Sequence, residues 1–242
     1  MRVLVISDVH GNYAALNAVL SEPHDMLICL GDMVGYGPEP GLCVRRILEE
    51  ADLVLRGNHD HALATGTGAG CPPMFEWLAD ATAHIGEAQV STAERRVLAR
   101  LPLRSSLRLD LSPYHLVHAT PTDPMYGHLE PTSDRWSREV LEIGPEILVV
   151  GHNHLQFRHH VGRTIISPGS VGQPRQGDSR AAYMIIEDGN FMFCRAAYDV
   201  ERTIKELERS EVHPAARATL TDLLRTGQPS LCVPRAHSAM TA

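Results

Sequence analysis

In Val3-Leu4-Val5-Ile6-Ser7-Asp8-Val9-His10, an apolar run leads directly into two side chains of types that bind metal ions. A short, continuous apolar run is typical of a buried strand. Asp8 and His10 lie two positions apart, so in an extended segment both side chains leave on the same side and can hold one cation. The chain therefore presents a candidate metal-binding pair at the end of its first predicted strand.

Four later apolar runs end in the same manner. They are residues 26–30 before Asp32, 53–55 before Asn58 and His59, 116–117 before His118, and 147–150 before His152 and His154. Side chains at the same ends of neighbouring strands converge, and in α/β sheets that edge is the usual ligand site. Each cluster alone is weak evidence, since an aspartate after a strand more often starts a turn. The ordered set predicts one metal site.

The types of side chain favour two adjacent ions. Asp32 follows Gly31, where the backbone can approach closely, and its two carboxylate oxygens can bridge two cations. Asn58 offers a neutral amide oxygen as a ligand. The pair His152 and His154, again two positions apart, gives one histidine to each ion.

His59 and Asp60 follow the asparagine directly. With Asn58 on the metal, His59 is predicted to point at the substrate. Asp60 is a candidate to orient the His59 ring, as carboxylates around metal sites commonly do.

The first part of the chain alternates predicted strands and helices, at 3–7, 13–21, 26–31, 41–51 and 53–56. This order favours a parallel arrangement of the strands. From about 62 to 103 the pattern becomes helical, and Ser91-Thr92-Ala93-Glu94 forms a capping-box sequence. We expect this helical insertion to lie over the site as a partial cap.

Further strands are predicted at 106–111, 114–118, 147–150, 163–167, 181–187 and 190–197, with a helix at 133–143 and a hairpin turn at Asp188-Gly189. Two sheets packed face to face with helices outside is the economical α/β arrangement. Helical patterns at about 200–226 complete a single domain over residues 1–226. Residues 227–242 are predicted to be a flexible tail.

The composition narrows the function. The chain has 242 residues and a net charge of −7, so we expect no binding of a long nucleic acid, although a metal site could take a small phosphate ester or nucleotide. Its five cysteines are widely spaced, and no run approaches the roughly 20 apolar residues of a membrane span. We therefore expect a cytoplasmic protein with no membrane contact, of undetermined oligomeric state. Histidines without a partner motif, such as His128, are predicted to be solvated surface residues or to form local hydrogen bonds.

Together, the motifs Asp8-x-His10, Gly31-Asp32, Gly57-Asn58-His59-Asp60, His118 and Gly151-His152-x-His154 resemble those of the calcineurin-like metallophosphoesterase superfamily, over about residues 1–200. The segments 34–38, 118–121 and 167–172 resemble its small bacterial phosphodiesterase-like branch. The resemblance implies a four-layer α-β-β-α sandwich, the metallo-dependent phosphatase fold. It also implies that Asp8, His10 and His154 bind one metal, that Asn58, His118 and His152 bind the other, and that Asp32 bridges them.

In that family the histidine at the position of His59 stabilises the transferring phosphoryl group and protonates the leaving oxygen. Two cations about 3.5–4 Å apart lower the pKa of a shared water, which then attacks the phosphorus in line as hydroxide. Such ligands accept Mn, Fe, Zn, Co or Ni, and we favour manganese. We predict a phosphodiesterase. The alternatives are a protein serine/threonine phosphatase, a dinucleoside polyphosphate hydrolase, or a non-catalytic protein-interaction scaffold, which would have no need of His59.

Two further residues are candidates for binding the substrate. Arg175 follows a loop expected to return beside His152 and His154, so it would contact the substrate phosphate or base, or else form a surface salt bridge. Tyr36 stands where similar protein phosphatases and tetraphosphatases carry an arginine for a terminal phosphate, and it would stack on a leaving group or serve packing. A monoester carries about −1.5 to −2 charge and suffers most from the loss of that arginine. This departure favours diesters.

Overall fold

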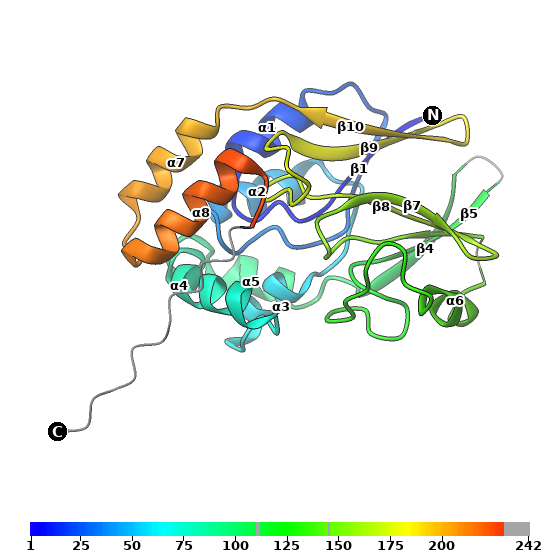
Figure 1. The fold of residues 1–242 in the computed structure, drawn as a ribbon, viewed down its shortest axis with the longest axis horizontal. Helices are drawn as coiled ribbons and strands as arrows, with labels where there is room; N and C mark the ends of the chain where they lie inside the picture. Colours follow the sequence, from blue (N-terminus) through cyan, green and yellow to red (C-terminus); the bar gives the residue numbers. More distant parts are fainter. Residues whose placement is uncertain (110–111, 145, 230–242) are drawn as a thin grey trace.

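A computed structural model describes residues 1–109, 112–144 and 146–229, and its centre is a pair of five-stranded mixed sheets. The first sheet has the order β10 (Asn190–Ala196), β9 (Ala181–Glu187), β1 (Arg2–Ile6), β2 (Met26–Cys29) and β3 (Leu53–Val54). The second has the order β4 (Arg104–Leu109), β5 (Ser112–Val117), β6 (Ile147–Val149), β8 (Thr164–Pro168) and β7 (Gln156–His160). In Figure 1, β1, β9 and β10 lie above the labelled strands of the second sheet. The predicted parallel pairing of β1 with β2 and of β2 with β3 is confirmed.

The period-two alternation of side chains along a strand builds two cores around the first sheet. Val3 and Val5 of β1 face the second sheet and pack in one cluster with Leu116 and Ile166. Leu4 and Ile6 face the other way, into a cluster with helices α1 (Tyr13–Leu20) and α2 (Pro40–Glu50). Each fully buried aliphatic side chain of this kind contributes about 1.5–3 kcal/mol.

The outer face of the second sheet is covered by α6 (Trp136–Glu139) and the short 3-10 helix η1 (Val140–Glu142). Trp136 lies there with its ring centroid 6.2 Å from that of Phe157. The predicted α-β-β-α order of layers is therefore confirmed. The helix expected at 133–143 is shorter, because its first residues form hydrogen-bonded turns and its last turn tightens to 3-10 geometry.

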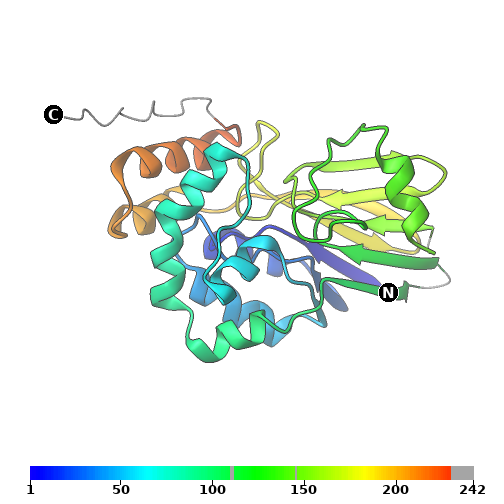
Figure 2. The same ribbon diagram turned by 90° about the horizontal axis from the view of Figure 1, so that it is seen from below.

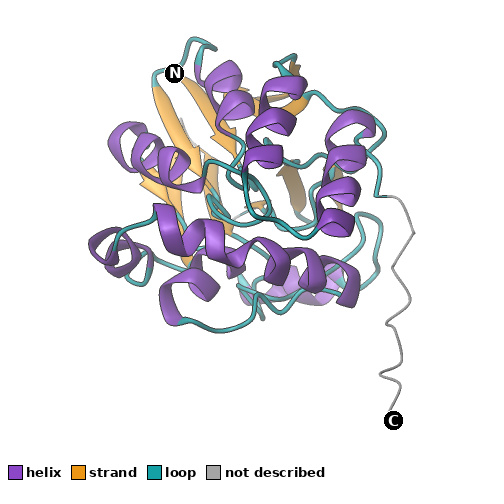
Figure 3. Cartoon of the chain, turned by 90° about the vertical axis from the view of Figure 1, so that its left-hand side faces the viewer, coloured by secondary structure: helices purple, strands orange, loops and turns teal. Residues whose placement is uncertain are grey.

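The helical insertion consists of α3 (Asn58–Thr65), α4 (Pro73–Gln89) and α5 (Thr92–Leu98). The predicted capping box is confirmed at α5, where Ser91 Oγ accepts from Glu94 N at 3.3 Å and Glu94 Oε2 accepts from Ser91 N at 2.7 Å. Two C-terminal helices, α7 (Val200–Arg209) and α8 (Pro214–Thr226), pack with α4 through an apolar cluster that contains Leu78, Leu207 and Leu220. Figures 2 and 3 show these helices gathered at one end of the molecule.

Strand β7 has no counterpart among the predicted strands. Its sequence is Gln-Phe-Arg-His-His, and only Phe157 is buried, since β7 is an edge strand paired with β8 alone. Edge strands carry polar residues, which weakens the apolar signal. Residues 110–111 of the strand expected at 106–111, and residues 230–242 of the expected tail, lie outside the described residues. Within the described part of the chain, no helix combines the length and apolar character required to cross a bilayer.

Candidate metal centre

The predicted ligands follow the carboxyl ends of strands from both sheets. Asp8 and His10 follow β1, Asp32 follows β2, and His118 follows β5. Backbone hydrogen bonds join these loops: Asp8 N donates to Gly31 O at 3.0 Å, and His10 N donates to Asp32 O at 2.9 Å. The two sheets thus deliver their polar ends to one place.

Strained backbone is concentrated at this place. Of the seven non-glycine residues with positive φ in the described chain, six belong to the predicted site: Asp8, His10, Asp32, Tyr36, His152 and His154. The left-handed conformation costs a non-glycine residue about 1–3 kcal/mol. Such strain persists only where surrounding contacts enforce it, and it is typical of functional sites.

The first ligand group contains Asp8, His10 and His154. His10 Nδ1 donates to Val34 O at 3.0 Å and His154 Nδ1 donates to Gln173 O at 2.7 Å, so the Nε2 atom of each neutral ring carries a lone pair. These two Nε2 atoms lie 3.0 Å apart, with Asp8 Oδ1 3.5 Å from that of His154.

Burial of both rings lowers the pKa of His10 and of His154 well below the usual value, which keeps them neutral. Asp8 Oδ1 is buried and has no hydrogen-bond partner among the described residues. Three converging lone pairs without a donor fit a cation, since a cation removes their mutual repulsion.

The second ligand group is built around Asn58. Asn58 Nδ2 donates to Ala69 O at 2.8 Å, which turns Oδ1 toward His118 Nε2 and His152 Nδ1, each 3.1 Å away. His118 Nδ1 in turn donates to Leu30 O at 3.0 Å. Burial lowers the pKa of His118, but the Asp32 carboxylate more than compensates and raises that pKa to about 9. The pocket therefore attracts positive charge.

Asp32 stands between the two groups. Its Oδ2 lies 3.3 Å from His118 Nε2 and 3.8 Å from His10 Nε2, and its Oδ1 accepts from His59 N at 2.9 Å. Burial opposes ionisation, but the charged His118 ring, which also hydrogen-bonds the carboxylate, holds the pKa of Asp32 well below its usual range. Three His and Asp groupings with metal-ligand spacing meet here, and they fit a divalent metal site.

Asp60 does not contact the His59 ring, so the orienting role expected for it is wrong. Its carboxylate accepts from the backbone N–H of Asp32 at 2.8 Å, Met33 at 2.9 Å, Gly57 at 3.1 Å and Val34 at 3.4 Å. These donors belong to the loop after β2 and the start of α3, which share the metal site. Asp60 therefore holds the loop that carries Asp32.

The neighbour of the His59 ring is a cysteine that the sequence did not single out. Cys71 Sγ lies 3.4 Å from His59 Nε2 and 3.5 Å from Tyr36 Oη. His59 is 5% exposed, and its burial lowers its pKa. No motif surrounds Cys71, and only the return of the chain after Gly70 brings it to the site.

A cavity of about 200 Å³ opens over the metal site and is lined by Asp32, Asn58, His59, Cys71, Phe75, His128, His152, His154, Arg175 and neighbouring residues. Arg175 lies in this wall, with its guanidinium carbon 3.6 Å from the Phe75 ring centroid and Nη2 donating to Gln173 Oε1 at 2.6 Å. His128 is exposed, as expected, but its ring lies 5.8 Å from that of His152 at the cavity.

Tyr36 also lines this cavity, but it is only 3% exposed. Its ring packs 4.7 Å from that of His10 and 4.6 Å from that of His59. This burial favours the packing role over stacking on a substrate.

Two packed sheets between helices, with histidine, carboxylate and amide groups gathered at the strand ends, are the features of metal-dependent phosphoesterases. The chain belongs to the calcineurin-like phosphoesterase superfamily, whose domain model matches residues 1–189. Membership of this superfamily supports a hydrolase.

Relatives and solved structures agree with this assignment. A metallophosphoesterase from Sphaerobacter thermophilus has a crystal structure that matches with a TM-score of 0.79 at 30% identity, covering 94% of this chain and 99% of that one. An uncharacterized protein of Methanocaldococcus jannaschii is 29% identical over 233 residues, 87% of this chain and 93% of that protein. A symmetrical bis(5′-nucleosyl)-tetraphosphatase of Paracidovorax citrulli is 34% identical over 127 residues, 49% of this chain and 44% of that protein.

Proposed function

We propose that this chain is a phosphodiesterase that works with two divalent metal ions. The observation that carries the proposal is the position of Asp32 Oδ2 between two groups of ligand atoms, 3.8 Å from His10 Nε2 and 3.3 Å from His118 Nε2. A carboxylate shared in this way is suited to a pair of ions. The unpartnered Asp8 Oδ1 and the facing imidazole nitrogens support the same view.

Asp8, His10 and His154 would hold one ion, Asn58, His118 and His152 would hold the other, and Asp32 would belong to both. When bound, two such ions neutralise phosphate oxygens and lower the pKa of a water to near neutrality. The proposed ligands combine hard oxygen atoms with imidazole nitrogens and include no thiolate. We favour Mn²⁺ for this reason.

His59 acts on the leaving oxygen in this proposal. Its backbone N–H is tied to Asp32 Oδ1 at 2.9 Å, so the ring is fixed relative to the ligands. Its Nε2 lies at the cavity wall beside Cys71, where a proton on this atom can pass to the departing alkoxide. Arg175, always charged, would bind a phosphate oxygen in this proposal.

The charge of the cavity supports a diester in preference to a monoester. Among the described residues that line the cavity, Arg175 is the only arginine or lysine, and part of its guanidinium already donates to Gln173. Glu130 lies at the same cavity and adds negative charge. A dianionic monoester is penalised more by this balance than a singly charged diester.

A matched pair of substrates tests the proposal. We expect metal-stripped protein to be inactive and to recover with Mn²⁺, and kcat/KM for bis(p-nitrophenyl) phosphate to exceed that for p-nitrophenyl phosphate under the same conditions. Faster turnover of the monoester would indicate a phosphatase instead of a phosphodiesterase. Lack of turnover of either ester with Mn, Fe, Zn, Co or Ni would favour the non-catalytic protein-interaction scaffold.

A further inference from the structure

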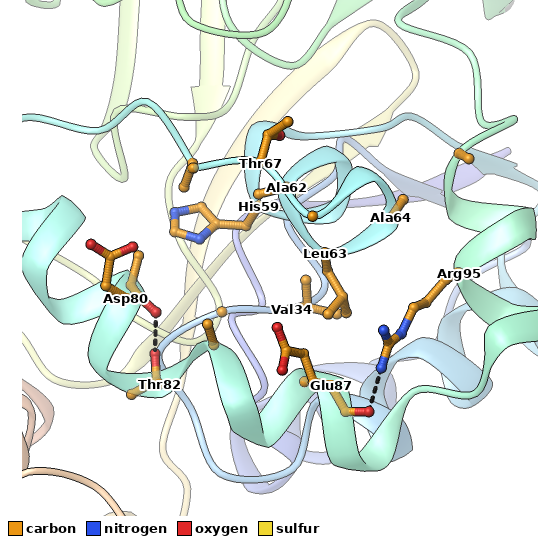
Figure 4. A pocket seen from close by; sticks show the side chains of 18 of the residues that line it. Val34, His59, Ala62, Leu63, Ala64, Thr67, Asp80, Thr82, Glu87 and Arg95 are labelled. Atoms are coloured by element: carbon orange, nitrogen blue, oxygen red, sulfur yellow. Dashed lines mark hydrogen bonds between the residues drawn. The ribbon is translucent and has the colours of Figure 1, made fainter.

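A second, larger cavity lies beside His59, among the helices of the insertion. Its volume is about 650 Å³, and it is bounded by α3, the loop at 66–69, α4 and α5 (Figure 4). We call it the helix pocket. His59 lines both the helix pocket and the cavity over the metal site, so the two spaces adjoin at this residue.

Small side chains create the helix pocket. Alanine and glycine make up half of the residues that line it, among them Gly35, Ala62, Ala79, Ala83 and Gly86. Ligand pockets usually measure about 300–1,000 Å³. The helix pocket is thus large enough for a group of nucleoside size.

His59 presents an unused polar atom on this side. Its Nδ1 has no hydrogen-bond partner among the described residues, although the side chain is more than nine-tenths buried. A Cβ at Gly35 would lie 2.5 Å from Nδ1, and Gly35 also lines the helix pocket, so Nδ1 faces this space. In Figure 4 the ring extends from α3 toward the side on which Asp80 lies. Nδ1 is not sealed from solvent, so a ligand in the helix pocket can reach it and donate a hydrogen bond to it.

The charged groups of the wall point to the kind of group that fits. Asp80 and Glu87 of α4 are exposed, and their carboxylates have no partner within the described residues, so they can accept hydrogen bonds. On the α5 side, Arg95 already donates to Val90 O and Glu87 O, and Arg96 is exposed. Two acids against two arginines give no net charge. A second phosphate would meet the α4 carboxylates, whereas neutral N–H donors would satisfy them.

We propose that the helix pocket receives the leaving alcohol of the phosphodiester, and that this alcohol is uncharged, of about nucleoside size and equipped with N–H donors. The inference rests on the proposed function and defines its substrate class. The phosphate lies over the metal site, and the leaving oxygen lies at His59. The remainder of the alcohol then extends past the ring, between α3 and α4.

Two methyl aryl phosphates with matched leaving groups test the inference: 4-(carbamoylmethyl)phenyl and its carboxylate isostere 4-(carboxymethyl)phenyl. We expect kcat/KM for the carboxamide to exceed that for the carboxylate by about tenfold, which is the low end for a hydrogen bond to a charged group. Asp80→Asn should reduce this ratio to about threefold or less. Glu49→Gln, an exposed acid on α2, is the matched control and should leave the ratio unchanged.

A second variant tests the space itself. Ala83→Phe should fill the helix pocket and lower kcat/KM for the carboxamide diester about tenfold, whereas Ala88→Phe, an exposed position of α4 outside the pocket, should not. Calorimetric titration with 4-(carbamoylmethyl)phenol gives a readout without turnover, and Ala83→Phe should abolish its binding.

The outcomes separate the two proposals. Two results would show that the helix pocket is not the leaving-group site: equal kcat/KM for the two diesters, or kcat/KM values that Asp80→Asn and Ala83→Phe leave unchanged. The phosphodiesterase proposal would stand in either case. If wild-type protein hydrolyses monoesters alone, the proposed function fails. Binding of the phenol that Ala83→Phe abolishes would then support the pocket, and absence of binding would overturn it as well.

Discussion

Replacement of Asp60 by alanine separates a structural role from a catalytic one. The carboxylate is fully buried and accepts four backbone N–H groups from two segments of the metal site, at 2.8 to 3.4 Å. In Asp60→Ala those donors lose their acceptor inside the protein. We expect a loss of stability and of metal affinity, although Asp60 is not a predicted ligand.

The magnitude follows from the three shorter hydrogen bonds. A hydrogen bond to a charged group contributes about 1.5–3 kcal/mol, and a buried donor left unpaired costs about 1–3 kcal/mol. Contributions from one network do not add fully, and water can enter the space of a deleted side chain. We therefore expect Asp60→Ala to lower the free energy of unfolding by about 4 kcal/mol. Asp60→Asn, which keeps one acceptor oxygen, should fall between alanine and wild type.

The assay is urea denaturation of metal-stripped protein, because bound metal would add its own stabilisation. Elemental analysis of the purified variants measures metal retention, and the exposed Glu49→Ala on α2 should stay within about 0.5 kcal/mol of wild type. Unchanged stability and metal content together with a large loss of turnover would refute this reasoning. That result would support the role first predicted for Asp60, which is to orient the His59 ring.

Four further changes have defined outcomes. Asp32→Ala should lose both metal ions, since its carboxylate is shared, and two retained equivalents by elemental analysis would contradict the bridging role. His59→Ala should keep metals and fold and lower turnover about 10²–10⁴-fold, most for poor leaving groups, so an unchanged rate on such an ester would rule out proton donation. Gly35→Ala should reduce activity with metals retained, because φ is +91° and the new Cβ would lie 2.5 Å from His59 Nδ1; wild-type kcat would show that the ring moves freely. Arg180 hydrogen bonds hold the pKa of Asp178 at about 2, below the usual value, so their stabilisation is present above about pH 4 and lost as pH falls through 2; Arg180→Ala should lower urea midpoints at pH 6 but not at pH 2.

The ligand cluster could be predicted from the sequence because strand ends follow from local apolar runs. Once 26–30 and 147–150 are identified as strands, Asp32 and His152 can only emerge at their carboxyl ends. The structure brings these side chains together with Asp8 and His118 as expected. What local sequence cannot supply is the atom that each side chain uses, which depends on partners such as the Leu30 carbonyl.

The misassignment of Asp60 has a local cause. Adjacency in sequence suggested that it touches His59, but consecutive residues at the start of a helix point in different directions. α3 begins at Asn58, so Asp60 is the third helical residue, and a carboxylate there reaches back to the backbone N–H of Gly57. The spacing Gly57-x-x-Asp60 contains this signal. Cys71 and the helix pocket carry no comparable signal, because both depend on how α3 and α4 cross.

Different segments of the chain supply the metal ligands and the walls of the helix pocket, and the two meet at His59. Strand ends from both sheets supply most of the ligand atoms, and their strained backbone leaves little freedom for change. The insertion begins with Asn58 and His59 and continues directly into the walls of the helix pocket. Substitutions on α4, such as those at Asp80 or Ala83, therefore alter the space for a leaving group without touching a predicted ligand. A rigid metal site joined at one histidine to a separate helical wall would allow the choice of substrate to change while the hydrolytic chemistry stays the same.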